Sequence, residues 1–197
     1  MDWHRFDGST LPATPWKNGG GVTHEVARYP ANAGLDLFDW RVSIARIASD
    51  GPFSAFAGVD RVITLLDGGG VHLTSDVGGI DHRLDCALQP FAFPGDVSIQ
   101  ARLLAGESND FNVMTRRAAC RAHVEVLRSA RPLSAPQGLL FSAGGQWRVQ
   151  VAGHAPEVLE PQHGLWWYQA LTWQLRPATP DAALLAVSIH PAAPLTP

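Results

Sequence analysis

Apolar and polar residues alternate along most of this chain, and that alternation restricts what it can fold into. In FDWRVSIA, which begins at Phe38, every second residue is apolar and the residues between are mostly polar. The segments VSIQARL, from Val97, and QWRVQV, from Gln146, repeat the pattern. Successive side chains of an extended strand point to opposite faces, so this period predicts half-buried β-strands.

Turn signals interrupt the alternating segments at short intervals. The chain has 19 glycines and 15 prolines among 197 residues, so a long uninterrupted helix is hard to place. Clusters such as DGP from Asp50, DGGG from Asp67 and PGD from Pro94 supply the backbone angles that turns need. Short strands separated by turns roughly every 8–12 residues predict an all-β sandwich or barrel.

The order of turns, glycine-rich hairpins and aromatic strands occurs twice, the second time in shortened form. We therefore expect two halves, residues 1–118 and residues 119–197, with a connection near residues 130–136. A half of about 75 residues buries little core alone, so the two halves are expected to pack together.

Composition argues against several function classes. The net charge is −3 and no long basic run occurs, so nucleic acid is not an expected partner. The opening MDWHRFDG has no apolar signal region, and no apolar run is long enough for a membrane span. Cys86 and Cys120 lie outside any C-x-x-C motif, which is typical of free thiols in a reducing compartment. A cytoplasmic protein without a membrane partner is expected.

The stretch WKNGGG, from Trp16 to Gly21, has the composition of a binding loop. It is no P-loop, because its lysine precedes the glycines and a strand pattern follows. Two interpretations remain: a turn that only carries the chain across a barrel mouth, or a ligand-facing turn. In the second, Trp16 stacks on the ligand, Lys17 adds charge, Asn18 offers an amide, and Gly19 and Gly20 let the backbone approach.

Arginines within strands are the other candidates. Arg41 and Arg61 lie in or beside apolar segments, and arginine is rarely buried without an anionic partner. They either point outward into solvent or project inward and grip a substrate carboxylate. In DFNVMTRR, from Asp110, one strand face carries Asn112, Met114 and Arg116, a set that suits a pocket wall.

No catalytic or metal-binding arrangement can be identified. The eight histidines form no H-x-H, H-x-x-x-H or H-E-x-x-H pattern, and no G-x-S-x-G is present. Acidic residues such as Asp60 and Asp110 lie beside turns, where capping the turn is the simpler interpretation. We therefore expect no metal, no cofactor and no catalytic residue.

Five strings in order resemble the HutD/Ves family: PWKNGGG from Pro15, FDWRVS from Phe38, DGPFS from Asp50, DRVITLLDG from Asp60 and DFNVMTRR from Asp110. The resemblance covers most of residues 12–118 and is looser beyond them. It implies a cupin fold, an RmlC-like jelly roll with two barrel halves in one chain (a bicupin). Many cupins hold a metal through an H-x-H motif, which is absent after the cupin-like turn PGDVS at Pro94, so the resemblance is to a metal-free cupin.

The family resemblance also implies a cytosolic modulator of histidine utilisation that binds an intermediate such as urocanate, formiminoglutamate or formylglutamate. Cupins often dimerise through edge strands, so a homodimer is an expectation. The expected ligand-binding set for a small anionic metabolite is Trp16, Lys17, Asn18, Gly19, Gly20, Trp40, Arg41, Arg61, Asn112 and Arg116. Two alternatives stay open: a metal-free isomerase, lyase or deformylase-like enzyme acting on a small carboxylate, and a protein-interaction module.

Overall fold

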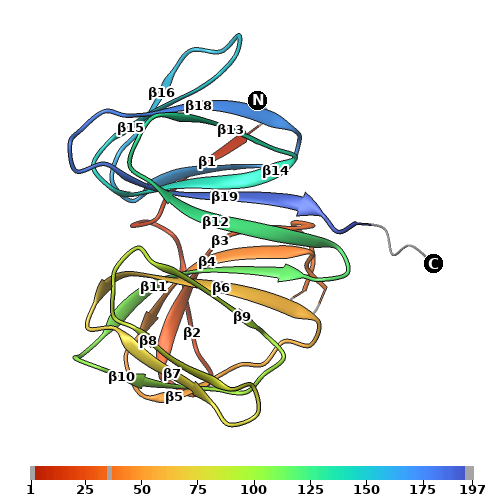
Figure 1. The fold of residues 1–197 in the computed structure, drawn as a ribbon, viewed down its shortest axis with the longest axis vertical. Coiled ribbons are helices and arrows are strands. Elements are labelled where there is room, and N and C mark those ends of the chain that lie inside the picture. The colour runs from red at the N-terminus through yellow and green to blue at the C-terminus, as the bar shows by residue number, and fades with distance from the viewer. Residues whose placement is uncertain (1–2, 35–36, 194–197) are drawn as a thin grey trace. The chain divides into compact units, whose positions relative to one another are not determined.

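The computed structural model of the chain describes residues 3–34 and 37–193 and is built from β-strands throughout (Figure 1). Nineteen strands and no α-helix occur in these ranges, which confirms the predicted all-β class. Accordingly, the described residues contain no helix with the length and apolar character to cross a membrane. The chain divides into two compact units. The central unit comprises Pro12–Arg121 and Ala192–Pro197, and the terminal unit comprises Met1–Leu11 and Ala122–Pro191.

The central unit consists of two antiparallel sheets. The larger sheet has the strand order β2 (Ala13–Pro15), β3 (Gly21–Tyr29), β4 (Trp40–Ile47), β11 (Ser108–Arg116), β6 (Val59–Gly68) and β9 (Pro90–Pro94). The smaller sheet has the order β5 (Gly51–Phe53), β10 (Ile99–Leu103), β7 (Val71–Ser75) and β8 (Ile80–Leu84). β4, β11 and β6 are neighbours although β11 is distant in sequence, so their side chains form one continuous surface.

The terminal unit also has two sheets. One has the order β1 (Trp3–Asp7), β17 (His163–Trp167), β14 (Gln137–Gly144), β19 (Ala183–Pro191) and β12 (Cys120–Leu127). The other has the order β13 (Arg131–Ala135), β18 (Leu171–Pro177), β15 (Trp147–Val151) and β16 (Glu157–Leu159).

The sequence predicted two halves divided after residue 118. The compact units differ from that prediction at the start of the chain. β1 pairs with β17, with Trp3 opposite Trp167, so residues 3–11 belong with the C-terminal half. The indole Nε1 of Trp3 also donates to Glu157 Oε1 at 2.7 Å. Local sequence patterns do not reveal such pairings, because the partner strands are far apart along the chain.

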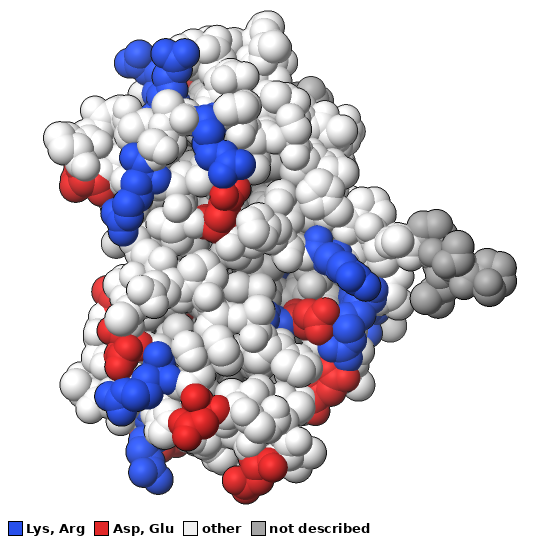
Figure 2. Space-filling model, viewed as in Figure 1, with Lys and Arg blue, Asp and Glu red and all other residues white. Residues whose placement is uncertain are grey.

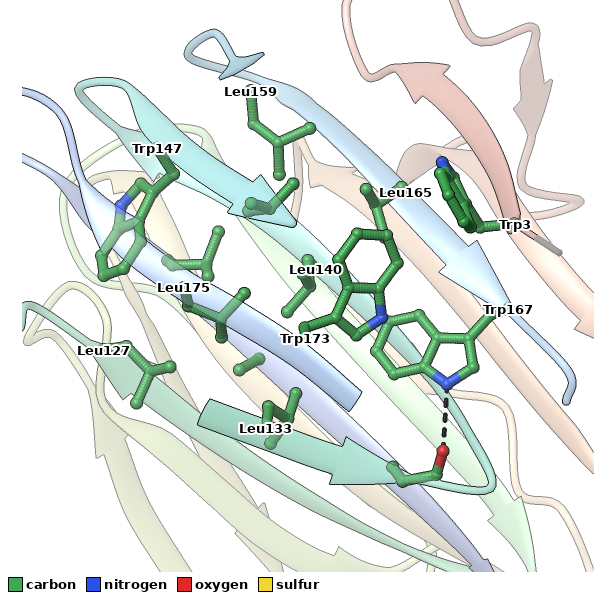
Figure 3. Close-up of a cluster of buried hydrophobic side chains, with 14 of the residues drawn as sticks. Trp3, Leu127, Leu133, Leu140, Trp147, Leu159, Leu165, Trp167, Trp173 and Leu175 are labelled. Carbon is green, nitrogen blue, oxygen red and sulfur yellow. Dashed lines mark hydrogen bonds between the residues drawn. The ribbon is translucent and has the colours of Figure 1, made fainter. Parts of the chain in front are cut away.

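Tryptophan and leucine fill the interior of the terminal unit (Figure 3). Trp147, Trp167 and Trp173 are fully buried, and the indole Nε1 of Trp167 donates to the carbonyl oxygen of Ala135 at 3.2 Å. Each buried indole removes a large apolar area from water, so these rings dominate the stability of this unit. The buried polar side chains among the described residues of this unit are Ser142 and Ser188, and neither is charged, so its interior is a packing core rather than a site for a charged ligand.

The core of the central unit lies between its two sheets. Ile47, Ile63 and Leu65 of the larger sheet pack with Val71, Leu73 and Ile99 of the smaller one. We call the side of the larger sheet that carries Ile47, Ile63 and Leu65 its inward face. Unlike the interior of the terminal unit, this face also carries charged groups.

Candidate functional site

Strand register places a group of polar side chains on the inward face. Asn112 lies opposite Ser43 on β4 and Ile63 on β6, and Asp110 lies opposite Ala45 and Leu65. Met114 lies opposite Arg41 and Arg61. Residues directly opposite each other in antiparallel strands share a face, so these groups lie on the same side as Ile63 and Leu65. We call Arg41, Ser43, Arg61, Asp110 and Asn112 the inward polar cluster.

Arg61 is the most unusual member of the cluster. Its side chain is buried, with 7% of the residue exposed, and its Nε lies 3.4 Å from Asn112 Oδ1. Its guanidinium carbon lies 5.2 Å from the ring centre of Phe53 and 5.1 Å from that of Phe93. No salt bridge to Arg61 is found within the described part of the chain. A buried cation without a carboxylate in contact is costly, and a bound anion would relieve that cost.

The pKa of Arg61 reflects this environment. Burial is the main cause that lowers the pKa of this guanidinium from its ordinary value to about 10. The charge of Asp110 opposes the fall, while the neighbouring positive charge of Arg41 adds to it. Arg61 nevertheless stays positively charged at neutral pH.

A glycine supports the stem of Arg61. Gly95, in the predicted PGD turn, is buried and donates its N–H to the carbonyl oxygen of Val59 at 2.7 Å. A Cβ at this position would lie 2.8 Å from that oxygen and 3.3 Å from Cγ and Cδ of Arg61. The turn therefore needs glycine, and any larger residue would displace the arginine stem.

Arg41 differs from Arg61 because it has a carboxylate partner. Its Nε lies 2.6 Å from Glu25 Oε2, and the other oxygen of Glu25 lies 2.8 Å from Arg28 Nε. Arg28 in turn donates to the carbonyl oxygen of Ala33 at 2.7 Å. Glu25 thus holds two arginines at the edge of the cluster and balances part of their charge.

Asp110 is the acidic member of the cluster, and the sequence did not single it out as a site residue. It is only 3% exposed, and burial raises the pKa of its carboxyl group to about 7, against the opposing effect of Arg61. The sequence suggested a turn-capping role because Asp110 follows GESN. The available signal was its alternation with Asn112 and Met114, which places all three on one face. Ser43, Phe53, Phe93 and Glu25 were also not among the expected site residues.

The glycine-rich turn closes on itself. The backbone N–H of Trp16 donates to the carbonyl oxygen of Gly21 at 2.9 Å, and Asn18 Oδ1 accepts from the backbone N–H of Gly20 at 3.0 Å. A Cβ on Gly21 would lie 2.3 Å from the carbonyl oxygen of Arg46, so close approach to β4 requires glycine there. Gly19 has a φ of 71°, which also favours glycine. These contacts account for Gly19 and Gly21 without a ligand.

Among the side chains of this turn, only Trp16 reaches the core between the sheets. Its indole Nε1 donates to Thr23 Oγ1 at 2.8 Å, and its ring meets Phe53 edge-on at 6.3 Å. Phe53 also contacts Arg61, so Trp16 lies one ring away from the cluster. Lys17, Asn18 and Gly19 are exposed.

Two expected ligand contacts are placed elsewhere by the structure. Trp40 is fully buried, and it alternates with Arg41 on β4, so it lies on the face opposite the inward polar cluster. Its ring stacks on Tyr29 at 6.2 Å. Arg116 donates through Nε to the carbonyl oxygen of Phe38 at 3.1 Å and lies over the Phe38 ring, where it holds that residue in place. Of the predicted set, the structure therefore brings together Arg41, Arg61 and Asn112.

Metal ligands are not grouped in the described ranges. No set of three His, Cys, Asp or Glu side chains there could hold an ion. The residues of the inward polar cluster include a single carboxylate and no histidine, so this donor set does not fit a resident metal.

Comparison with known proteins identifies the family. The HutD family model matches residues 8–185. This chain belongs to the HutD family. Proteins named Ves from Cronobacter sakazakii and Citrobacter koseri are 40% identical to this HutD family member over 166 and 182 residues. Those alignments cover 83% and 91% of this chain and 86% and 90% of the relatives.

Solved structures agree with the family and the fold. HutD from Pseudomonas fluorescens SBW25 is 33% identical, with a TM-score of 0.80 over 97% of this chain and 100% of that one. A conserved protein of unknown function from Pseudomonas aeruginosa PAO1 is 32% identical, with a TM-score of 0.85 over 96% and 99%. A cupin 2 conserved barrel domain protein from Leptotrichia buccalis shares only 9% identity but has a TM-score of 0.60 over 95% of this chain and 96% of that chain. This HutD family member therefore has the cupin fold that its sequence predicted.

Proposed function

We propose that this HutD family protein binds a small anionic metabolite at the inward polar cluster and does not need to transform it. The observation that carries the proposal is Arg61, a buried guanidinium that no carboxylate contacts in the described part of the chain. A ligand carboxylate would supply the missing negative charge and could accept two parallel hydrogen bonds from the guanidinium. Asn112 and Ser43 add an amide and a hydroxyl on the same face.

The proposed ligands are intermediates of histidine breakdown, namely compounds of the urocanate, formiminoglutamate or formylglutamate class. Family membership supports this choice, as does the charge of these compounds, each of which carries a carboxylate. By binding such a compound, a cytoplasmic protein would modulate histidine utilisation. A homodimer formed through edge strands completes the proposal, and the molar mass in solution would test that part.

Surface charge supports a small ligand over a nucleic acid. On the face drawn in Figure 2, positive and negative side chains are interspersed, and no broad patch of one sign is present. The net charge of −3 agrees with this distribution. Nucleic-acid binding usually depends on a basic patch that follows the phosphate backbone.

A thermal-shift screen of these intermediates tests the proposal, with each compound quantified again after incubation. A ligand present at about 100 times its dissociation constant stabilises the native state by about 2.7 kcal/mol. A shift with the compound intact supports binding without turnover. The test variant is Arg61→Met, which should lose the shift. Its control is Arg46→Met, which removes an exposed arginine that pairs with Glu107 outside the cluster. If no compound shifts the wild-type protein, or if Arg61→Met shifts as strongly as wild type, the proposed site is wrong.

An enzyme acting on a small carboxylate is the second candidate, and Asp110 is the observation that favours it. A buried carboxyl group with a pKa of about 7 can both release and accept a proton near neutral pH. Consumption of a bound compound by wild-type protein, abolished in Asp110→Asn, would identify a metal-free enzyme. A compound that binds and is recovered unchanged argues against it.

A further inference from the structure

Asp110 and Arg61 form a pair of opposite buried charges that do not touch. Neither takes part in a salt bridge among the described residues, although each affects the ionisation of the other. Arg61 reaches Asn112, and Asp110 is the next residue of β11 on the same face. Asn112 and Asp110 are two residues apart on this face, about 7 Å along the strand, so a ligand held at Arg61 and Asn112 would have Asp110 as its neighbour.

The surroundings favour a ligand with two different ends. At one end, Arg61 offers hydrogen-bond donors only, since guanidinium has no acceptor. At the other, ionised Asp110 offers acceptors only. A plain carboxylate would satisfy Arg61 but leave a buried negative charge beside its own, which is unfavourable.

We propose that Asp110 makes this site selective for short carboxylates that carry a hydrogen-bond donor, such as an amide N–H, a few bonds from the carboxylate. This inference rests on the proposed function, because it assumes that Arg61 holds the ligand carboxylate. The donor of the ligand contacts ionised Asp110. A carboxylate without such a donor binds together with a proton, which neutralises Asp110.

The sign of the pH effect follows from the charges. Binding of an anion at Arg61 cancels the positive charge that lowers the pKa of Asp110, so that pKa rises on binding. The free protein loses this proton as pH rises through about 7, whereas the complex with a plain carboxylate keeps it. Affinity for a plain carboxylate is therefore constant at low pH and falls above about pH 7. A ligand N–H that donates to ionised Asp110 opposes this fall.

Several other charged groups lie on the strands packed around Asp110. Arg61 on β6 keeps its positive charge over this range, and Glu25 on β3 is paired with Arg41 on β4 and with Arg28. From the smaller sheet, the neighbouring core positions on β7 and β10 are hydrophobic. On that side, His82 on β8 lies opposite Leu73 and stacks on Phe91 with ring centres 3.6 Å apart.

Two matched probes test the proposal by isothermal titration calorimetry: succinamate and levulinate. They share a carboxylate and a chain of similar shape, but succinamate ends in an amide NH₂ where levulinate has a methyl group. Neither end group titrates. We expect wild-type protein at pH 8 to bind succinamate at least about tenfold more tightly, a difference of about 1.4 kcal/mol. Titration in buffers of different ionisation enthalpy should show close to one proton taken up with levulinate and fewer with succinamate.

Variants identify the group responsible. Asp110→Asn should bind levulinate with no loss of affinity between pH 6 and pH 8 and should show little preference between the probes. Asp67→Asn makes the same chemical change at an exposed residue of β6 and should behave as wild type. His82→Gln should keep the pH dependence. If Asp110→Asn does not fold, proton uptake measured on wild-type protein and on His82→Gln still decides the matter.

The outcomes separate this inference from the function on which it rests. If both probes bind equally, depend on Arg61 and show no proton uptake, the role of Asp110 is wrong and the carboxylate site stands. If the pH dependence disappears in His82→Gln and persists in Asp110→Asn, the role of Asp110 is also wrong. If neither probe nor any pathway intermediate binds, the proposed function itself fails.

Discussion

Replacing Arg61 with methionine separates the energetic cost of a buried cation from the binding that the cation supports. Methionine keeps the unbranched stem, and its thioether would lie between Phe53 and Phe93, where sulfur–aromatic contacts are favourable. The substitution removes the guanidinium and leaves no buried charge in its place. Asn112 loses a hydrogen-bond donor that lies at 3.4 Å and is therefore weakly engaged.

The expected gain in stability follows from the pKa of Arg61. Its fall from the ordinary value to about 10 means that folding disfavours the charged form by about 3 kcal/mol, since each tenfold change in ionisation corresponds to about 1.4 kcal/mol. This cost is present at every pH below about 10, because the arginine is charged there in both states. Methionine removes it but also loses cation–π attraction to two rings, worth about 0.5–1 kcal/mol each. The net expectation is a gain of about 1–2 kcal/mol.

Urea denaturation at pH 6 measures this change, with the thermal midpoint as a second readout. At pH 6 Asp110 is largely protonated, so loss of the neighbouring positive charge has little effect on it. For a protein of this size the midpoint should rise by about 2–4 °C per kcal/mol. The same variant should lose binding of carboxylate ligands by at least about 100-fold, since a buried charged partner is worth about 3 kcal/mol or more.

Arg46→Met is the matched control. Arg46 is exposed and its pair with Glu107, at 3.1 Å, is solvated, so stability should change by less than about 0.5 kcal/mol. If Arg61→Met lowers stability by more than 1 kcal/mol while Arg46→Met does not, Arg61 is a satisfied structural residue. The proposal that Arg61 lacks an anionic partner and binds a ligand carboxylate would then be refuted.

Three further predictions concern Asp110, Trp40 and metal. The free energy of unfolding of the wild-type protein should fall as pH rises from about 4 to about 7 and then level off, because native Asp110 keeps a proton that the unfolded chain releases. Urea denaturation of Asp110→Asn at the same pH values should lack that fall. An equal fall in the two proteins would contradict a buried, protonated Asp110. Trp40→Ala should lower stability by about 3–5 kcal/mol through cavity formation. Because Trp40 lies on the opposite face, ligand affinity should change by less than about twofold. A larger loss of affinity, measured by calorimetry, would show that Trp40 belongs to the site. Excess EDTA should leave the thermal midpoint unchanged, whereas a clear fall would reveal a structural metal.

Strand alternation predicted the fold class well but could not choose the functional face of β4. Trp40, Val42 and Ser43 are all buried, so both faces of this strand are covered. Alternation separates the two faces, and it gives no reason to prefer the side of Arg41 over that of Trp40. Only the register with β6 and β11, which comes from distant segments, shows that Arg41, Arg61 and Asn112 share a side.

Asp110 illustrates a second limit of sequence reasoning. An aspartate beside a turn is usually exposed, and here a bend at residues 104–106 lies just before β11. The bulge between Asn109 and Asp110 shifts the register with β6, so that Asp110 lies opposite Leu65. The extra residue of this bulge is Leu66 of β6, so β11 keeps its own alternation and Asp110 shares a face with Asn112 and Met114. The local sequence did not reveal that this face is covered at Asp110.

The pairing of β1 with β17 bears on the order in which the protein can assemble during synthesis. The first strand leaves the ribosome long before its partner, which begins at His163. Nearly all of the central unit, residues 12–121, is made in the meantime and can fold as a block. The N-terminal strand must therefore stay unpaired until the last quarter of the chain emerges, and an edge strand in that state is a target for premature pairing. A tag or chaperone that occupies residues 3–7 would consequently affect the unit that is completed last.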